Sequence, residues 1–327
     1  MPELPEVETV VRELNNKLKG KTIKSVEIRL PKVVAIGPGA VPPRRQVKSS
    51  KVLKFVKLLT GQKIASVARR AKLLIFDFER KTGERPLPNP PHAWGGDIKI
   101  DGSLAMLVHL KMTGQFIYFK KSELNKKIRI INKATAPVHA MPCKYTHAIF
   151  TFNDGSKLFY NDVRQFGYLK LVSDTELPFV RDLTEYGPEP LSLEFTFDVF
   201  RSILKRRPNL KIKQLLTDPK LIAGIGNIYS DEILFHAKVL PIRIVLRIKN
   251  QELRRIFKAI KKVLKKGIEA KGSSVGDFIR TDGSWGAMGK YHYVYMRSGM
   301  PCKVCGTTIK SAKFNGRTGS FCPKCQH

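Results

Sequence analysis

The sequence predicts an α+β protein of several domains, with a β-rich first half, a helical middle part and a short β-hairpin at the C-terminus. Strand-like apolar runs separated by turn residues fill most of the first 180 residues. Helical periodicity dominates after residue 188, and four of the five cysteines fall within the last 26 residues. At 327 residues the chain is long enough for two or three domains, each with its own core.

The first half begins with a helix. The segment Val7–Leu18 carries apolar residues at helical spacing, and Gly20 ends it. Strands are expected at Thr22–Leu30, Lys63–Ala68, Leu73–Phe78, Ala105–Leu110, Phe116–Phe119, Ala148–Phe152 and Lys157–Tyr160. Asn153–Ser156 joins the last two as a hairpin turn. We therefore expect residues 2–180 to form a β-sandwich with flanking helices.

Two stretches interrupt this pattern. Residues 80–96 are rich in proline, and residues 120–144 are basic, with Pro137 and Pro142 near their end. We predict that both stretches are long, exposed loops.

The middle part, residues 188–290, reads as helical after Pro188-Glu-Pro190. Helices are expected at Phe197–Lys205, Ile212–Leu216, Ile228–Phe235 and, as a long amphipathic helix, at about 250–270. Residues 271–289 are rich in glycine and serine and predict a mobile loop. Residues 293–327 would form the third domain.

The charge balance restricts the class of partner. Sixty Lys+Arg against 27 Asp+Glu leave a formal charge of +33, which favours a polyanion. Nucleic acid is the first candidate and an anionic membrane surface the second. No run of eighteen apolar residues and no apolar leader is present, so we expect a cytoplasmic protein without a membrane partner.

The clustered cysteines predict a metal site. Cys302, Cys305, Cys322 and Cys325 form two CxxC pairs with sixteen residues between them. Four thiolates close a tetrahedral zinc site without an open position for water, so we expect one structural Zn²⁺. The segment between the pairs is then a hairpin with a basic tip. Cys143 stands apart and is interpreted as an incidental thiol.

The N-terminus offers a nucleophile. Removal of Met1 would leave Pro2 with a free secondary amine, whose pKa of about 8 keeps more of it neutral than a lysine at pH 7. Such an amine forms a cationic iminium with a sugar aldehyde, and that cation accepts electrons during elimination. Glu3 and Glu6 stand close in the sequence as acid and base candidates. On these residues alone, an ordinary helix N-terminus explains the pattern better.

Several motifs together resemble the formamidopyrimidine-DNA glycosylases, in order along nearly the whole chain. The similar segments are Pro2–Thr9, Arg69–Lys72, His109–Gly114, Asp162–Gly167, Ile222–Tyr229 and Gly316–Cys322. Lys111 departs from the family's pattern, because it replaces a glycine. The resemblance implies a helix-two-turn-helix domain between the β-sandwich and a C-terminal β-hairpin zinc finger.

The resemblance also implies catalytic roles. Pro2 would be the Schiff-base nucleophile and Glu3 the acid that opens the deoxyribose ring. Lys72 would assist β-elimination, although on position alone it could be a solvated lysine at a strand edge. Arg317 would assist δ-elimination by gripping the phosphate that leaves.

A base inside a duplex must be flipped out before it can be excised, and the resemblance assigns the filling of the hole to Met112, Arg164 and Phe166. The competing interpretation places Met112 and Phe166 in the core of a sheet.

The remaining predicted DNA contacts concern phosphates. The glycines before Asn227 would let backbone N–H groups and the Asn227 amide reach a phosphate. Lys213 is a further candidate for a phosphate or base contact. Tyr145 stands where the family often has a phosphate-binding histidine, and His147 follows it, so the histidine role stays open.

The function that this implies is a bifunctional DNA glycosylase and AP lyase of base excision repair. It would remove 8-oxoguanine and formamidopyrimidines from double-stranded DNA by β,δ-elimination, as a monomer and with no cofactor beyond zinc. One alternative is an endonuclease VIII-type enzyme for oxidised pyrimidines; Leu4 and the Met112, Arg164 and Phe166 trio favour the purine type. The other is a non-catalytic DNA-binding homologue, against which the presence of Pro2, Glu3, Lys72 and Arg317 argues.

Overall fold

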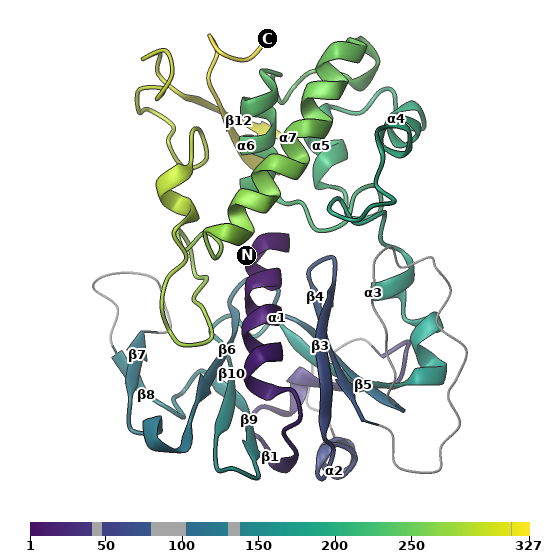
Figure 1. Cartoon of the computed structure of the whole chain (residues 1–327), viewed down its shortest axis with the longest axis vertical. Coiled ribbons are helices and arrows are strands. Elements are labelled where there is room, and N and C mark those ends of the chain that lie inside the picture. Colours follow the sequence, from purple (N-terminus) through teal and green to yellow (C-terminus); the bar gives the residue numbers. More distant parts are fainter. Residues whose placement is uncertain (41–47, 80–102, 130–137, 315) are drawn as a thin grey trace.

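The computed structural model describes residues 1–40, 48–79, 103–129, 138–314 and 316–327. It has a β-rich lobe at one end of the long axis and a helical lobe at the other (Figure 1). Helix α1 (Leu4–Leu18) runs along the first lobe, and its N-terminal end points into the second. No helix among the described residues is both long and apolar enough to span a bilayer.

Two sheets build the first lobe. One has the order β1-β9-β10-β6 and the other the order β2-β11-β5-β4-β3. The strands are β1 (Ile23–Ile28), β2 (Val34–Ile36), β3 (Ile64–Arg70), β4 (Leu73–Phe78), β5 (Leu104–His109), β6 (Gly114–Phe119), β9 (Thr146–Phe152), β10 (Lys157–Asp162) and β11 (Tyr168–Ser173). Apolar residues of α1 such as Val7 and Leu14 share one buried cluster with Phe76, Phe116 and Phe150 of the two sheets. The predicted β-sandwich with a flanking helix is confirmed.

The residues 120–144 contradict one prediction. Within their described part, β7 (Lys127–Arg129) and β8 (Val138–Ala140) pair as a small antiparallel sheet, and Ile128, Met141 and Cys143 are buried. Most described residues of this stretch are exposed, as predicted, but the expectation of a loop was wrong. Lys-Ile-Arg alternates as in a strand, which puts one apolar side chain inward between two solvated basic ones. Residues 80–96 lie outside the described residues.

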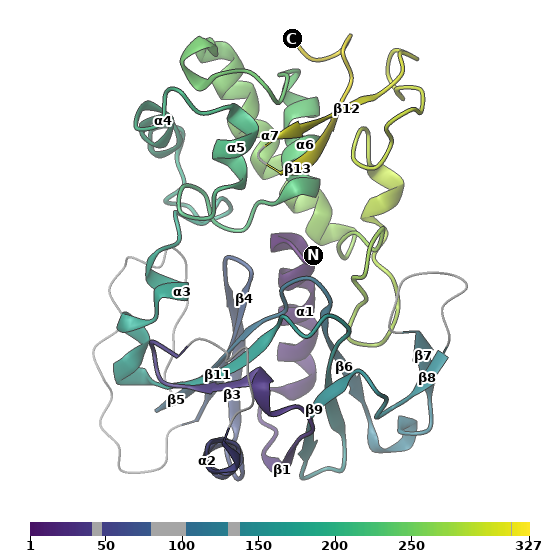
Figure 2. The same ribbon diagram turned by 180° about the vertical axis from the view of Figure 1, so that it is seen from behind.

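The second lobe follows α3 (Arg181–Thr184) and is helical, as the periodicity predicts. It contains α4 (Phe197–Lys205), α5 (Ile212–Thr217), α6 (Asn227–Ala237) and α7 (Asn250–Glu269). Their apolar faces share one core, in which the Phe257 ring lies 5.7 Å from Phe195 and 6.0 Å from Phe200. Helix α2 (Ser49–Leu59) of the first lobe was not predicted. Strands β12 (Lys310–Phe314) and β13 (Arg317–Phe321) form the C-terminal hairpin, which packs against α6 (Figure 2).

The segment after α7 reaches back to the first lobe. Phe278 is buried in the first lobe's core, and the Glu13 carboxylate of α1 accepts hydrogen bonds from Arg280 Nε and Thr281 Oγ1, both at 2.6 Å. The backbone N–H of Tyr118 donates to Thr281 O at 2.8 Å. In this structure the glycine-rich segment is therefore docked on α1 and β6, while its mobility stays a prediction.

Candidate active site and DNA interface

The first turn of α1 is inserted into the second lobe. The side chain of Leu4 is fully buried in that lobe's core, and its N–H donates to Gly224 O at 3.0 Å. A Cβ on Gly224 would lie 2.8 Å from the Leu4 side chain, and one on Gly226 would lie 2.3 Å from the Glu3 carboxyl carbon. Glycine is therefore required at both positions, because the side chains of Leu4 and Glu3 approach the backbone closely there, which explains the Gly-Ile-Gly spacing.

Glu3 lies at the beginning of α6. Its carboxylate is 2% exposed and accepts hydrogen bonds from Ile228 N at 2.9 Å and from Tyr229 N at 3.3 Å. N–H groups of the first helical turn have no partner within the helix, and the helix dipole also favours a negative charge there. The second lobe thus fixes the position of a catalytic candidate that belongs to the first.

Glu6 lies one helical turn further along α1 and is also buried. It accepts hydrogen bonds from Glu3 N at 2.9 Å, Tyr229 Oη at 2.6 Å and Ser273 N at 2.7 Å. Burial raises its pKa to about 6, and the nearby charge of Glu3 adds to that rise. Glu6 can therefore gain or lose a proton close to neutral pH.

Lys72 faces the same place from the turn after β3. Its Nζ donates to Ile225 O at 3.2 Å. Burial lowers the pKa of this ammonium; the negative charge of Glu3 opposes that change, and the positive charge of Arg317 adds to it. Arg317 is exposed at the start of β13, and Pro2 is buried next to Glu3. All four predicted catalytic residues thus come together where the two lobes and the C-terminal hairpin meet.

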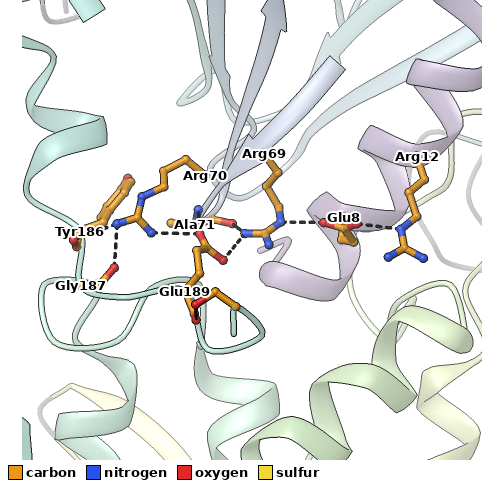
Figure 3. A network of polar contacts seen from close by, with 9 residues as sticks. Glu8, Arg12, Arg69, Arg70, Ala71, Tyr186, Gly187 and Glu189 are labelled. Atoms are coloured by element: carbon orange, nitrogen blue, oxygen red, sulfur yellow. Dashed lines mark hydrogen bonds and ion pairs between the residues drawn. The ribbon is translucent and has the colours of Figure 1, made fainter. Parts of the chain in front are cut away.

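A buried ion-pair network holds the turn that carries Lys72 (Figure 3). Ala71 adopts a left-handed φ of 53°, and its N–H donates to Glu189 Oε1 at 2.6 Å. Arg69 and Arg70 bind the same carboxylate at 2.9 Å and 3.1 Å. Arg69 also donates to Glu8 of α1 at 2.9 Å. The turn is therefore fastened both to α1 and to the connection between the lobes.

The three hole-filling candidates lie together on the surface. Met112 and Phe166 are 36% and 54% exposed, which excludes the interpretation that they belong to a sheet core. Arg164 Nη1 lies 2.8 Å from Met112 Sδ, and its guanidinium carbon lies 4.9 Å from the centroid of the Phe166 ring. The trio comes from two loops, one after β5 and one after β10.

Asp162 joins these two loops. Its buried carboxylate accepts hydrogen bonds from Gly167 N at 2.7 Å and from the Thr113 hydroxyl. Thr113 Oγ1 in turn accepts from Arg164 N at 2.9 Å. Lys111, at the family's glycine position, has a left-handed φ of 51°. The hydrogen bonds of Asp162 and Thr113 thus hold the two loops, while the side chains at 112, 164 and 166 stay exposed.

The predicted phosphate contacts divide into two groups. Asn227 and Tyr145 are partly exposed, and Asn227 Nδ2 donates to Thr318 O of β13 at 2.8 Å. Lys213 is buried in an ion pair with Asp231, and His147 is buried with its Nε2 2.7 Å from Asp162 O. In this structure neither Lys213 nor His147 presents its polar end to a surface that DNA could reach.

Two site residues were not singled out from the sequence. His109 accepts a hydrogen bond from Lys111 N on its Nδ1 at 3.0 Å, and burial lowers its pKa to about 3, helped by the charges of Lys111 and Lys72. It is therefore a neutral imidazole beside Lys72. Burial raises the pKa of Tyr295 to about 12, with the charge of Glu3 adding to that rise, and its hydroxyl is bonded to Asn227. The motif at 109–114 carried a signal for His109; nothing in the sequence pointed to Tyr295.

The cysteine quartet has the geometry of a closed metal site. All four Sγ atoms lie within 4.8 Å of one another, with Cys302 and Cys325 at 3.9 Å and Cys305 and Cys322 at 3.5 Å. A Zn–S bond of about 2.3 Å gives tetrahedral S–S edges of about 3.8 Å, so the quartet fits one zinc ion.

Two acids of α6 fasten this module to the second lobe. The Glu232 carboxylate accepts hydrogen bonds from the backbone N–H groups of residues 293, 294 and 295 at 2.9–3.1 Å. Asp231 accepts from Ser320 N at 2.9 Å. The position of Arg317 on the hairpin thus depends on contacts with α6.

Comparison with known proteins agrees with this geometry. Three family models match consecutive parts of the chain: the formamidopyrimidine-DNA glycosylase N-terminal domain over residues 1–169, its H2TH domain over 186–278, and the zinc finger found in FPG and IleRS over 299–327. The formamidopyrimidine-DNA glycosylase of Heliobacterium modesticaldum is 36% identical over 326 residues, covering 100% of both chains. That of Bacillus subtilis is 34% identical, covering 100% of this chain and 99% of its own.

Solved structures give the same result. A complex of Lactococcus lactis Fpg with DNA containing an abasic site matches with a TM-score of 0.75 and 31% identity, over 99% of each chain. MutM in complex with DNA containing carbocyclic 8-oxo-G matches with the same score and identity, over 100% of each chain. The predicted fold class and the predicted structural zinc site are both confirmed. The chain belongs to the formamidopyrimidine-DNA glycosylase family, as a DNA glycosylase of base excision repair.

Proposed function

We propose that the protein removes 8-oxoguanine and formamidopyrimidines from double-stranded DNA and then cuts the strand by β,δ-elimination, as a cytoplasmic monomer. The observation that carries this proposal is the meeting of Pro2, Glu3, Lys72 and Arg317 at one place, although they come from three separate parts of the chain. The three domains that we propose are residues 2–180, 188–290 and 293–327.

The chemistry follows from the amine. With Met1 removed, the Pro2 nitrogen attacks the sugar carbon C1′, the damaged base leaves, and Glu3 gives a proton to the ring oxygen as the sugar opens. The resulting iminium withdraws electrons from C2′, so that a base can take the C2′ proton while the 3′ phosphate leaves. Glu6, whose pKa is raised to about 6, is positioned to take part in these proton transfers. Arg317 would grip the second phosphate as it leaves.

The exposed trio supports a flipped-base mechanism. An apolar side chain inserted into the stack opens it, and a guanidinium can pair with the base that loses its partner. Met112, Arg164 and Phe166 form one exposed group with this composition. Among the related structures that hold DNA, one contains an abasic site and another carbocyclic 8-oxo-G.

The experiment that tests this function compares two duplexes, one with a single 8-oxoguanine and one with a single thymine glycol. We expect strand cleavage at 8-oxoguanine to be faster, with products ending in phosphate on both sides of the gap, as β,δ-elimination requires. Faster cleavage at thymine glycol would favour the endonuclease VIII-type alternative. Binding without cleavage of either duplex would favour a non-catalytic homologue.

A further inference from the structure

A cavity of about 460 Å³ lies in the second lobe, between α7 and the segment that leads to the zinc module. Its walls include His236 from the last turn of α6, three lysines from the C-terminal half of α7, and Tyr291 and Tyr293. In Figure 1 the short helix of residues 288–291 lies beside that half of α7. Cavities of this size are typical of small-ligand sites.

This cavity is separate from the active site. Helix α6 begins at Asn227 beside Glu3, and His236 is nine residues further along it. At 1.5 Å per residue the two ends are about 13 Å apart along the axis. None of the lining residues is among those that hold Glu3, Lys72 or the hole-filling loops.

One wall of the cavity is aromatic. Tyr293 stacks on Phe235 with ring centroids 4.9 Å apart and an interplanar angle of 22°. The centroid of the His236 ring lies 5.0 Å from that of Tyr293, with the two rings at 72°. Tyr291 is 46% exposed, and Lys266 Nζ lies 4.5 Å from the centroid of its ring. The wall therefore combines a ring held in place by stacking with an exposed ring that another aromatic group can cover.

Some polar side chains of the cavity have no polar partner in the described part of the chain. Among the described residues, the ring of His236 makes no hydrogen bond, and neither Lys262 nor Lys265 forms an ion pair. Lys266 lies 3.8 Å from Glu269, the one acid of the lining. Burial and the charge of Lys262 both lower the pKa of His236. In the described structure the cavity thus has two exposed lysines without an ion pair, and an imidazole without a hydrogen bond, next to an exposed aromatic ring.

We propose that this cavity binds a nucleotide unit, free or at the end of single-stranded DNA. The base would stack on Tyr291, the phosphate would pair with Lys262 and Lys265, and His236 would hydrogen-bond to the base or sugar. Aromatic rings beside basic side chains are the common means of binding nucleotides without sequence preference. The site is independent of excision, so the proposal does not depend on the function proposed above.

The test uses the full-length protein saturated with a duplex that carries a tetrahydrofuran abasic analogue, so that the active-site cleft is occupied. Fluorescently labelled dAMP and a labelled tetrathymidylate are then titrated separately, with anisotropy as the readout. We expect at least one probe to bind the saturated complex. Tighter binding of dAMP would identify a free nucleotide as the occupant, and tighter binding of the tetranucleotide a DNA strand.

The variant Tyr291→Ala removes the stacking contact, and the double variant Lys262→Gln/Lys265→Gln removes both phosphate contacts; each should weaken binding at least about tenfold. Lys258→Gln, an exposed lysine of the same helix outside the cavity, is the matched control and should not change it. Unchanged cleavage of the 8-oxoguanine duplex shows that each variant is folded. The proposal is overturned if neither probe binds the saturated complex, or if the cavity variants bind as well as the control.

Discussion

Two buried glutamates of this protein are bound in nearly the same way and serve different ends. Glu3 accepts two backbone N–H groups at the start of α6, and Glu232, further along that helix, accepts those of three residues before the zinc module. Glu3 lies beside Lys72 and Pro2, whereas the charged groups that interact with Glu232 include Lys303 and the neighbouring acid Asp231. Backbone donors alone therefore do not identify a catalytic carboxylate; the neighbouring reactive groups do.

This comparison predicts that Glu3→Gln has the largest effect. The amide keeps the shape of the side chain but cannot deliver a proton, and general acid catalysis is typically worth about 10²–10⁴-fold. Single-turnover excision of 8-oxoguanine should fall by that amount, while binding to a duplex with an abasic analogue changes little. Cleavage at a preformed abasic site should keep part of its rate, because the sugar there is already able to open. Glu194→Gln, at an exposed position, is the control.

Removing the hole-filling side chains should produce the next largest effect. Phe166→Ala and Arg164→Ala leave Pro2 and Glu3 in place but no longer offset the few kcal/mol needed to unstack a base. We expect excision of 8-oxoguanine to slow by roughly 10–100-fold. Cleavage at a preformed abasic site should slow less, because no base has to be unstacked. Equal losses on the two substrates would remove the hole-filling role from these residues.

Glu232→Gln should have the opposite effects to Glu3→Gln: stability and DNA binding should fall, while the rate of excision changes little. The new amide group faces N–H donors, so at least one buried donor loses its partner at a cost of about 1–3 kcal/mol. We expect a lower unfolding temperature and weaker DNA binding, because the zinc module and Arg317 are less firmly held. Single-turnover excision at saturating enzyme should stay within a few-fold of the unchanged protein. A loss of chemistry as large as that of Glu3→Gln would contradict the distinction between the two acids.

The smallest predicted effect is a pH dependence from Glu6. Its folded-state pKa of about 6 lies above the ordinary 4.5, so the folded protein holds this proton until the pH rises through about 6. The stability that Glu6 contributes is thus full below about 4.5 and is lost as the pH rises through 6. If ionised Glu6 takes up a proton during elimination, abasic-site cleavage should rise several-fold between pH 5 and 7. That rise should be absent in Glu6→Gln. If the pH profile of Glu6→Gln matches that of the unchanged protein, Glu6 does not take up the proton.

The sequence predicted most helices and strands and the metal site, because these depend on local patterns, but it missed α2, β2, β7, β8 and β11. Apolar periodicity located α4, α5, α6 and α7 to within a few residues. The hairpin between β9 and β10 followed from its turn residues. The cysteine spacing alone was enough to predict the metal site.

The contacts between distant segments could not be predicted in the same way. The role of Glu189 depends on Arg69 and Arg70, about 120 residues earlier in the chain, and no local pattern indicates that pairing. Tyr295 belongs to a segment whose backbone N–H groups bind Glu232, a residue 63 positions earlier in the chain. Lys213 has the positive charge that a phosphate ligand needs, yet it is buried in an ion pair with Asp231. Chemical type can thus be read from the sequence, but exposure is decided by tertiary packing.

Borohydride trapping can show whether the amine of Pro2 is the nucleophile, because reduction of the iminium leaves a stable bond between protein and DNA. Two preparations would be incubated with a labelled 8-oxoguanine duplex and borohydride, one with a free N-terminal Pro2 and one with an N-terminal extension that leaves Glu3 in sequence. Mass spectrometry confirms each N-terminus, and binding to an abasic-analogue duplex confirms that both are folded. We expect a covalent protein–DNA adduct on the N-terminal peptide of the first preparation and almost none for the second. Full trapping by the extended protein, with the adduct on a lysine, would contradict this expectation.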